Sequence, residues 1–89
     1  MRINENFVLR QVAGSWVVLP VGEATLNFNG MMTLNGSGSL LWKTLEQGAN
    51  RETLANALTK EYEVSLEQAL ADVDDFIAKL VEAGCIVIE

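Results

Sequence analysis

The sequence contains no histidine and only one cysteine, Cys85. Histidine is the commonest general base and the commonest metal ligand, so acid–base catalysis and metal binding lose their usual residue. A lone cysteine cannot form an internal disulfide or a thiolate zinc site. Because no residue near it would lower its pKa, we expect Cys85 to be a small buried apolar side chain rather than a nucleophile. The sequence therefore argues against an enzyme, and no cofactor or metal is expected.

Long apolar runs and basic residues are also scarce. No stretch approaches 18 apolar residues, and the first residues lack the apolar segment of a secretion signal. Six lysines and arginines against twelve acidic residues give a net charge of −6. That sign is opposite to the one that attracts phosphate backbones and anionic membranes. We therefore expect a cytoplasmic protein that binds neither nucleic acid nor membranes.

At 89 residues the chain has room for one compact domain, residues 1–89, and its N-terminal third has the composition of strands. β-Branched and aromatic residues are frequent there and are broken by glycine. Ala13-Gly14 fits a tight connection, and Asn29-Gly30 is the dipeptide that most readily adopts a type I′ hairpin turn. The sequence predicts an antiparallel β-meander of three or four strands. The candidate strands are Phe7–Val12, Ser15–Leu19, Ala24–Phe28 and Met31–Leu34.

The remainder of the chain is rich in Leu, Ala, Glu and Lys and is divided by helix capping residues. Asn35 and Asn50 can each cap a following helix, and Ser65 with Gln68 has the spacing of a capping box. Gly84 stands where a left-handed residue would end the third helix. The sequence thus predicts an α+β, winged-helix-like fold in which the β-meander is followed by three α-helices.

The acidic residues are concentrated at the C-terminal end, which bears on the winged-helix comparison. Residues 61–89 contain eight acidic residues and one basic residue, whereas residues 1–60 have a net charge of +1. The last helix of a DNA-binding winged helix enters the major groove and is basic. Here it would present Asp72, Asp74 and Asp75 to phosphates and be repelled. A regulatory domain that binds DNA or a transcription partner is therefore kept only as the alternative.

The third predicted helix has an unusually wide apolar stripe. At about 100° per residue its apolar side chains cover roughly 160°, whereas a stripe of about 100° is enough to face one core. The stripe consists of Leu66, Ala69, Leu70, Val73, Phe76, Ile77, Leu80 and Val81. Two interpretations are open: either the helix lies in a cleft of its own domain and buries all of these side chains, or part of the stripe faces a peptide groove.

Met31–Leu34 would be the last strand of the meander and would leave one row of backbone N–H and C=O groups unpaired. The segment contains no lysine, proline or bulge of the kind that protects an edge strand, and its methionines offer adaptable side chains. An extended peptide that adds a strand to this edge is the matching function. The alternatives are that the N-terminus of the chain covers the edge, or that a second copy does so in a homodimer.

A set of positions spread along the chain is distinctive when its members are taken together: Leu34-Asn35 and Gly38, Leu41-Trp42 and Leu45, Leu54 to Leu58, Glu61-Tyr62-Glu63-Val64, Asp72-Val73, Phe76-Ile77, Leu80 and Ala83-Gly84. With these residues the chain resembles the PqqD-like family, also described as RiPP recognition elements, over nearly its whole length. The segment from Val21 to Gly30 is longer here than in many members.

The resemblance implies a non-enzymatic adaptor that binds the leader of a ribosomally synthesised precursor peptide and presents it to a modifying enzyme in natural product biosynthesis. In the family the leader pairs with the third strand and lies against the third helix. In the name-giving pathway the modifying enzyme is of the radical S-adenosylmethionine type, but other members serve other modifications. The peptide-binding residues that the resemblance implies here are Met31, Met32, Thr33, Leu34, Ala69, Asp72, Val73, Phe76 and Leu80.

Overall fold

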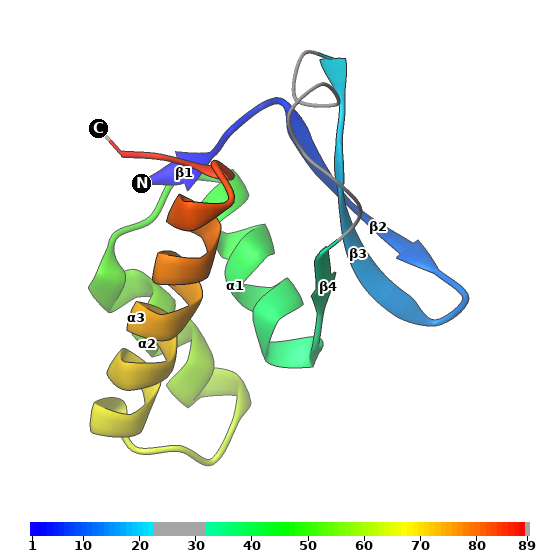
Figure 1. Cartoon of the computed structure of the whole chain (residues 1–89). Coiled ribbons are helices and arrows are strands. Elements are labelled where there is room, and N and C mark those ends of the chain that lie inside the picture. The colour runs from blue at the N-terminus through cyan, green and yellow to red at the C-terminus, as the bar shows by residue number, and fades with distance from the viewer. Residues whose placement is uncertain (23–31, 89) are drawn as a thin grey trace.

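An antiparallel sheet followed by three helices makes up most of the structure, a computed structural model that describes residues 1–22 and 32–88 (Figure 1). The predicted α+β arrangement is confirmed. The strands are β1 (Arg2–Ile3), β2 (Phe7–Val12), β3 (Ser15–Pro20), β4 (Met32–Leu34) and β5 (Ile86–Val87), and the helices are α1 (Gly36–Glu46), α2 (Arg51–Glu61) and α3 (Leu66–Glu82).

The larger sheet has the strand order β2-β3-β4, with both pairs antiparallel. The predicted connection Ala13-Gly14 joins β2 to β3, and both of its residues have positive φ, +51° and +83°, as a type I′ turn requires. The strands predicted at Phe7–Val12 and Ser15–Leu19 correspond to β2 and β3. β2 has the predicted range, and β3 ends one residue later than predicted, at Pro20. The predicted strand Ala24–Phe28 and the turn Asn29-Gly30 lie outside the described residues.

Asparagine side chains begin the first two helices, as predicted. The Asn35 side-chain oxygen accepts a hydrogen bond from the Gly38 backbone N–H at 2.8 Å, and the Asn50 oxygen accepts one from the Thr53 N–H at 2.8 Å. Each bond satisfies one of the backbone donors that the first turn of a helix leaves free. These local bonds fix where α1 starts, directly after β4.

The capping box predicted at the start of α3 is only half formed. Ser65 accepts from the Gln68 backbone N–H at 3.1 Å, as a cap should. The Gln68 side chain, however, donates to the Asp72 carboxylate at 2.9 Å instead of reaching back to the Ser65 N–H. The amide nitrogen of Gln68 donates to a charged acceptor one turn along the helix, and a side chain extended toward Asp72 does not bring its oxygen back to the Ser65 N–H.

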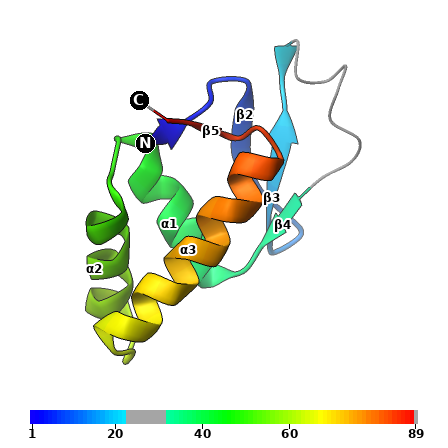
Figure 2. The ribbon, with the colours of Figure 1, turned by 60° about the vertical axis from the view of Figure 1, so that its left-hand side comes forward.

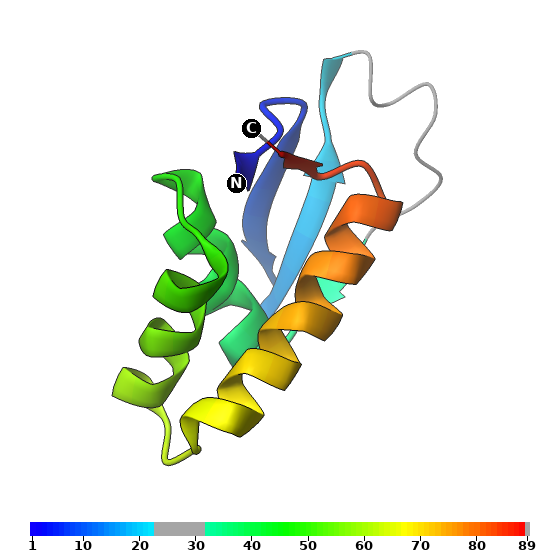
Figure 3. The same cartoon turned by 90° about the vertical axis from the view of Figure 1, so that its left-hand side faces the viewer.

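Gly84 ends α3 in the predicted left-handed conformation, with φ of +77°. The Cys85 N–H donates to the Leu80 carbonyl at 2.8 Å and the Gly84 N–H to the Val81 carbonyl at 3.1 Å, which is a Schellman motif. The chain then turns back as β5 and pairs antiparallel with β1, so the two termini lie side by side in Figures 1 to 3. This small second sheet was not predicted.

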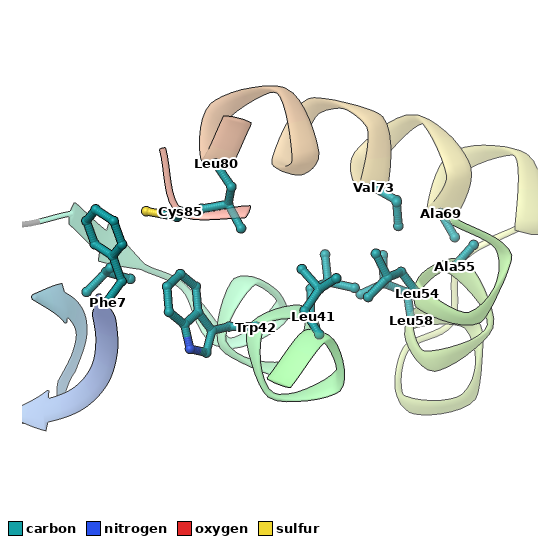
Figure 4. Packing of buried hydrophobic residues seen from close by; sticks show 12 residues of the cluster. Phe7, Leu41, Trp42, Leu54, Ala55, Leu58, Ala69, Val73, Leu80 and Cys85 are labelled. Atoms are coloured by element: carbon teal, nitrogen blue, oxygen red, sulfur yellow. The ribbon is translucent and has the colours of Figure 1, made fainter. Parts of the chain in front are cut away.

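The core lies between the three helices and the inner face of the sheet (Figure 3), with Phe7 and Trp42 at one end of the cluster and Ala69 next to Ala55 at the other (Figure 4). Only part of the wide stripe of α3 is used there. Ala69, Val73 and Leu80 are fully buried, whereas Leu66 and Val81 keep about half of their surface exposed. The interpretation in which α3 buries its whole stripe is therefore wrong.

Gly84, which ends α3, and Ala13, in the turn between β2 and β3, both have a positive φ and give a matched pair of stability predictions. Gly84→Ala forces a Cβ into a positive φ although nothing lies within 4 Å, so the free energy of unfolding should fall by about 1 kcal/mol. Ala13→Gly relieves the same strain in the hairpin and should raise it by about 0.5 kcal/mol. Urea unfolding of both variants checks this, and a neutral Gly84→Ala would contradict it.

Candidate functional site

The strand β4 has a neighbour on one side only within residues 1–22 and 32–88. It pairs with β3 in the register Trp16 to Leu34, Val17 to Thr33 and Val18 to Met32. The N-terminal segment, one of the alternatives for covering this edge, pairs with β5 instead. The outer edge of β4 therefore faces a space that no described strand fills.

The hairpin fixes which backbone groups of β3 point toward β2. A two-residue turn closes on a hydrogen-bonded pair, here Val12 and Ser15, and such pairs then alternate along the strands. At the open end of the hairpin the Val21 N–H donates to the Asn6 carbonyl at 2.7 Å, so Asn6 and Val21 form a hydrogen-bonded pair, as the alternation from the turn requires. The odd-numbered residues of β3 therefore bond to β2, and the even-numbered residues turn their backbone groups toward β4.

This alternation identifies the open position of the edge. Trp16 and Val18 direct their N–H and C=O groups at Leu34 and Met32, which stand opposite them. The residue between, Thr33, must then direct its own N–H and C=O away from the sheet. Thr33 is an exposed residue, and its N–H and C=O have no hydrogen-bond partner among the described residues.

A groove with a volume of about 710 Å³ lies between β4 and α3. In Figure 2 α3 crosses the view diagonally and β4 lies along its flank. The apolar lining residues come from both walls and from the helices behind them: Met32, Leu34, Leu41, Leu58, Phe76, Leu80 and Ala83. The charged lining residues all belong to α3: Asp72, Asp75, Lys79 and Glu82.

Gly38 allows the first turn of α1 to pack closely against both walls of the groove. A Cβ at this position would lie 3.3 Å from the Leu34 Cβ, 3.1 Å from the Asn35 side-chain oxygen and 3.5 Å from the Phe76 ring. A Cβ here would press on the Asn35 cap and on Leu34 of β4, while its distance to the Phe76 ring is an ordinary contact. The glycine therefore lets the first turn of α1 lie close to β4.

The charges on α3 separate into a paired set and an unpaired set. Asp74 points toward α2, where the Arg51 guanidinium donates two hydrogen bonds to it, at 2.7 and 2.8 Å. These hydrogen bonds hold the pKa of Asp74 below its usual value and that of Arg51 above it. By contrast, Asp75 and Glu82 make no salt bridge with any described residue. The wall of the groove that α3 forms therefore has a net negative charge, which Lys79 neutralises only in part.

Comparison with known proteins agrees with this arrangement. The chain matches the family described as "Coenzyme PQQ synthesis protein D (PqqD)" over residues 15–86. It belongs to the PqqD family. No curated protein matches the chain significantly.

Two solved structures are similar in fold to this chain. The first, "TbiB1 in Complex with the TbiA(beta) Leader Peptide", is 24% identical with a TM-score of 0.79, and the match covers 100% of this chain and 99% of that one. The second, "Lasso peptide synthetase B1 complexed with the leader peptide", is 25% identical with a TM-score of 0.77, covering 98% and 96%. Both of those proteins carry a leader peptide.

Six of the nine residues predicted for peptide binding line the groove: Met32, Thr33, Leu34, Asp72, Phe76 and Leu80. Ala69 and Val73 do not, because both are fully buried in the core. Met31 lies outside the described residues. The nine predicted residues did not include Asp75, Lys79 and Glu82, which also line the groove, although their spacing from Asp72 by three, seven and ten residues puts them along the same side of a helix.

The other candidate chemistry in the chain is weak. Cys85 has no exposed surface, and burial raises the pKa of its thiol to about 11, so it is protonated at neutral pH. Within the described ranges no three acidic or thiol groups converge as metal ligands would. None of the three helices is long and apolar enough to span a bilayer in that part of the chain.

The raised pKa of Cys85 predicts a pH effect on stability. Above about pH 9 the thiol ionises in the unfolded chain but stays protonated in the folded chain until about pH 11. The unfolded state then binds fewer protons, so the free energy of unfolding should fall as the pH rises through this window. Urea unfolding from pH 8 to 11 should show a steeper fall for the wild type than for Cys85→Ala. Equal slopes would contradict the assignment.

Proposed function

We propose that this PqqD-family chain binds the leader segment of a ribosomally made precursor peptide as an added strand on β4 and presents it to a modifying enzyme. The observation that carries the proposal is the outward-facing N–H and C=O of Thr33 beside an apolar groove. The two fold neighbours solved with leader peptides support it.

Two kinds of contact would hold the peptide. Backbone hydrogen bonds to β4 supply affinity for any extended chain, and alternate side chains of that chain would face α3. There Phe76 and Leu80 offer apolar surface, and burying one large apolar side chain is worth about 1.5–3 kcal/mol. Selectivity between peptides then comes from this second set of contacts.

The arrangement supports an adaptor better than an enzyme. The hydroxyl groups that line the groove belong to Thr33 and Ser37, and Ser37 donates to the Asn35 amide oxygen, which is not a base that could activate it. The Cys85 thiol is buried and does not line the groove. The modifying enzyme is thus a second partner of the bound complex. A radical S-adenosylmethionine enzyme is the candidate that the family's name-giving pathway suggests.

The alternatives use the same surfaces less well. A nucleic acid would meet three carboxylates on the groove face of α3, so no observation favours the DNA-binding alternative. A second copy could pair through β4, but each copy has a net charge of −6 and brings the same acidic helix to the contact. The homodimer is retained as an outcome of the experiment below.

Proline substitutions on the two edge strands test strand addition. Thr33→Pro removes the outward donor of β4, and Gln11→Pro removes the equivalent outward donor of β2, the other edge of the sheet. Calorimetric titration with synthetic leader segments of short precursors encoded near this gene should show at least about tenfold weaker binding for Thr33→Pro. Phe76→Ala should weaken binding about as much, and Gln11→Pro should leave it unchanged.

Equal losses for both proline variants would overturn strand addition at β4. Sedimentation velocity of the free chain is the companion measurement. A concentration-dependent dimer that Thr33→Pro abolishes would mean that the edge serves self-association instead.

A further inference from the structure

A smaller hollow adjoins the groove at the end where β4 meets α1. It has a volume of about 380 Å³ and lies between the start of α1 and the end of α2. Its walls include Leu58, Tyr62 and Val64, and it shares Asp72 and Leu58 with the main groove. A long side chain of a peptide lying along β4 can therefore pass Asp72 and enter this side pocket.

The unpaired negative charge of α3 is concentrated at the same end. Asp72 and Asp75 are one turn apart, and neither carboxylate makes a salt bridge with a described residue. Lys79 is four residues after Asp75 and three before Glu82, so it offsets part of the charge of both. Asp72 is two turns from Lys79 and lines the side pocket, so the least compensated carboxylate of the groove lies there.

The start of α1 also lines the side pocket, and its partial positive charge opposes the attraction of Asp72 for a cation. Asn35 already offsets much of it, because its side-chain oxygen accepts from the Gly38 N–H at 2.8 Å and from the Ser37 hydroxyl at 3.0 Å. A helix N-terminus is worth about half an elementary charge, against the full charge of Asp72, the carboxylate that lines the side pocket. The net field in the pocket mouth is therefore negative.

We propose that the side pocket takes a lysine or arginine side chain of the bound leader peptide. The aliphatic stem would lie against Leu58 and Val64, while the charged head lies beside Asp72. Asp75 adds to the attraction from one turn away in the main groove. The Tyr62 ring, which is 42% exposed, adds a surface over which a cation is favourable. The inference rests on the proposed function and names the class of peptide that the groove selects.

The side pocket also sets where the basic residue stands in the peptide. The pocket lies on the Asn35 side of β4, because Asn35 lines both hollows. A strand advances about 3.3 Å per residue. In the peptide, the basic residue should therefore stand about one to three positions from the residue that pairs with Thr33, on the side toward Asn35. It follows or precedes that residue according to the direction in which the peptide runs along β4.

A random twelve-residue peptide library displayed on phage tests the selection directly. We expect the wild type to enrich peptides with lysine or arginine at one fixed position, and the double variant Asp72→Asn/Asp75→Asn to lose this enrichment. Asp74→Asn is the matched control, because it removes a carboxylate from the same helix that is paired with Arg51 outside the groove. It should select the same peptides as the wild type.

The best wild-type peptide then gives a double-mutant cycle by calorimetry. Binding should weaken about three- to tenfold when its basic residue is replaced by glutamine, and by a similar factor in the double variant. The two losses should not add when combined, because they remove the same interaction. Tyr62→Leu should reduce the affinity only for the peptide that keeps its basic residue.

The outcomes separate this inference from the proposed function. Peptides that shift the Thr33 amide signal but show no basic preference, or bind the double variant equally well, would overturn the inference and leave strand addition standing. If no library peptide or leader segment moves the Thr33 signal, both fail.

Discussion

The functional geometry depends on the phase of the β2–β3 hairpin. The two-residue turn at Ala13-Gly14 decides which backbone groups of β3 face β4, and through the register it decides that Thr33 faces outward. A slip of one residue would turn the Thr33 groups into the sheet and would move the side chains of Met32 and Leu34 to its other face. The turn therefore controls a binding edge that is twenty residues away in sequence.

The remaining contacts hold α3 at a fixed distance from that edge. The Schellman motif at Gly84 returns the chain so that β5 pairs with β1, and the Arg51–Asp74 pair connects α3 to α2. Since none of these contacts involves the Phe76 side chain, the flank of α3 that carries it stays available to the groove. The acidic residues divide in the same way, with Asp74 paired internally and Asp75 left facing the groove.

Elements with local signals could be predicted from the sequence, and elements without them could not. The caps Asn35 and Asn50 and the stop at Gly84 act within a few residues, so they were predictable. The pairing of β1 with β5 joins two-residue strands at opposite ends of the chain, which leave no periodic pattern. For the site, helical periodicity predicted that α3 has a wide stripe, but it could not tell that Ala69 packs against α2 while Phe76 faces the groove.

Amide hydrogen exchange at β4 tests the central claim most directly. In the free protein the Thr33 amide should exchange much faster than those of Met32 and Leu34, which bond to β3, and a saturating leader peptide should slow Thr33 by at least about tenfold. A Thr33 amide that is already protected without peptide, or that stays unprotected in the complex, would contradict the account.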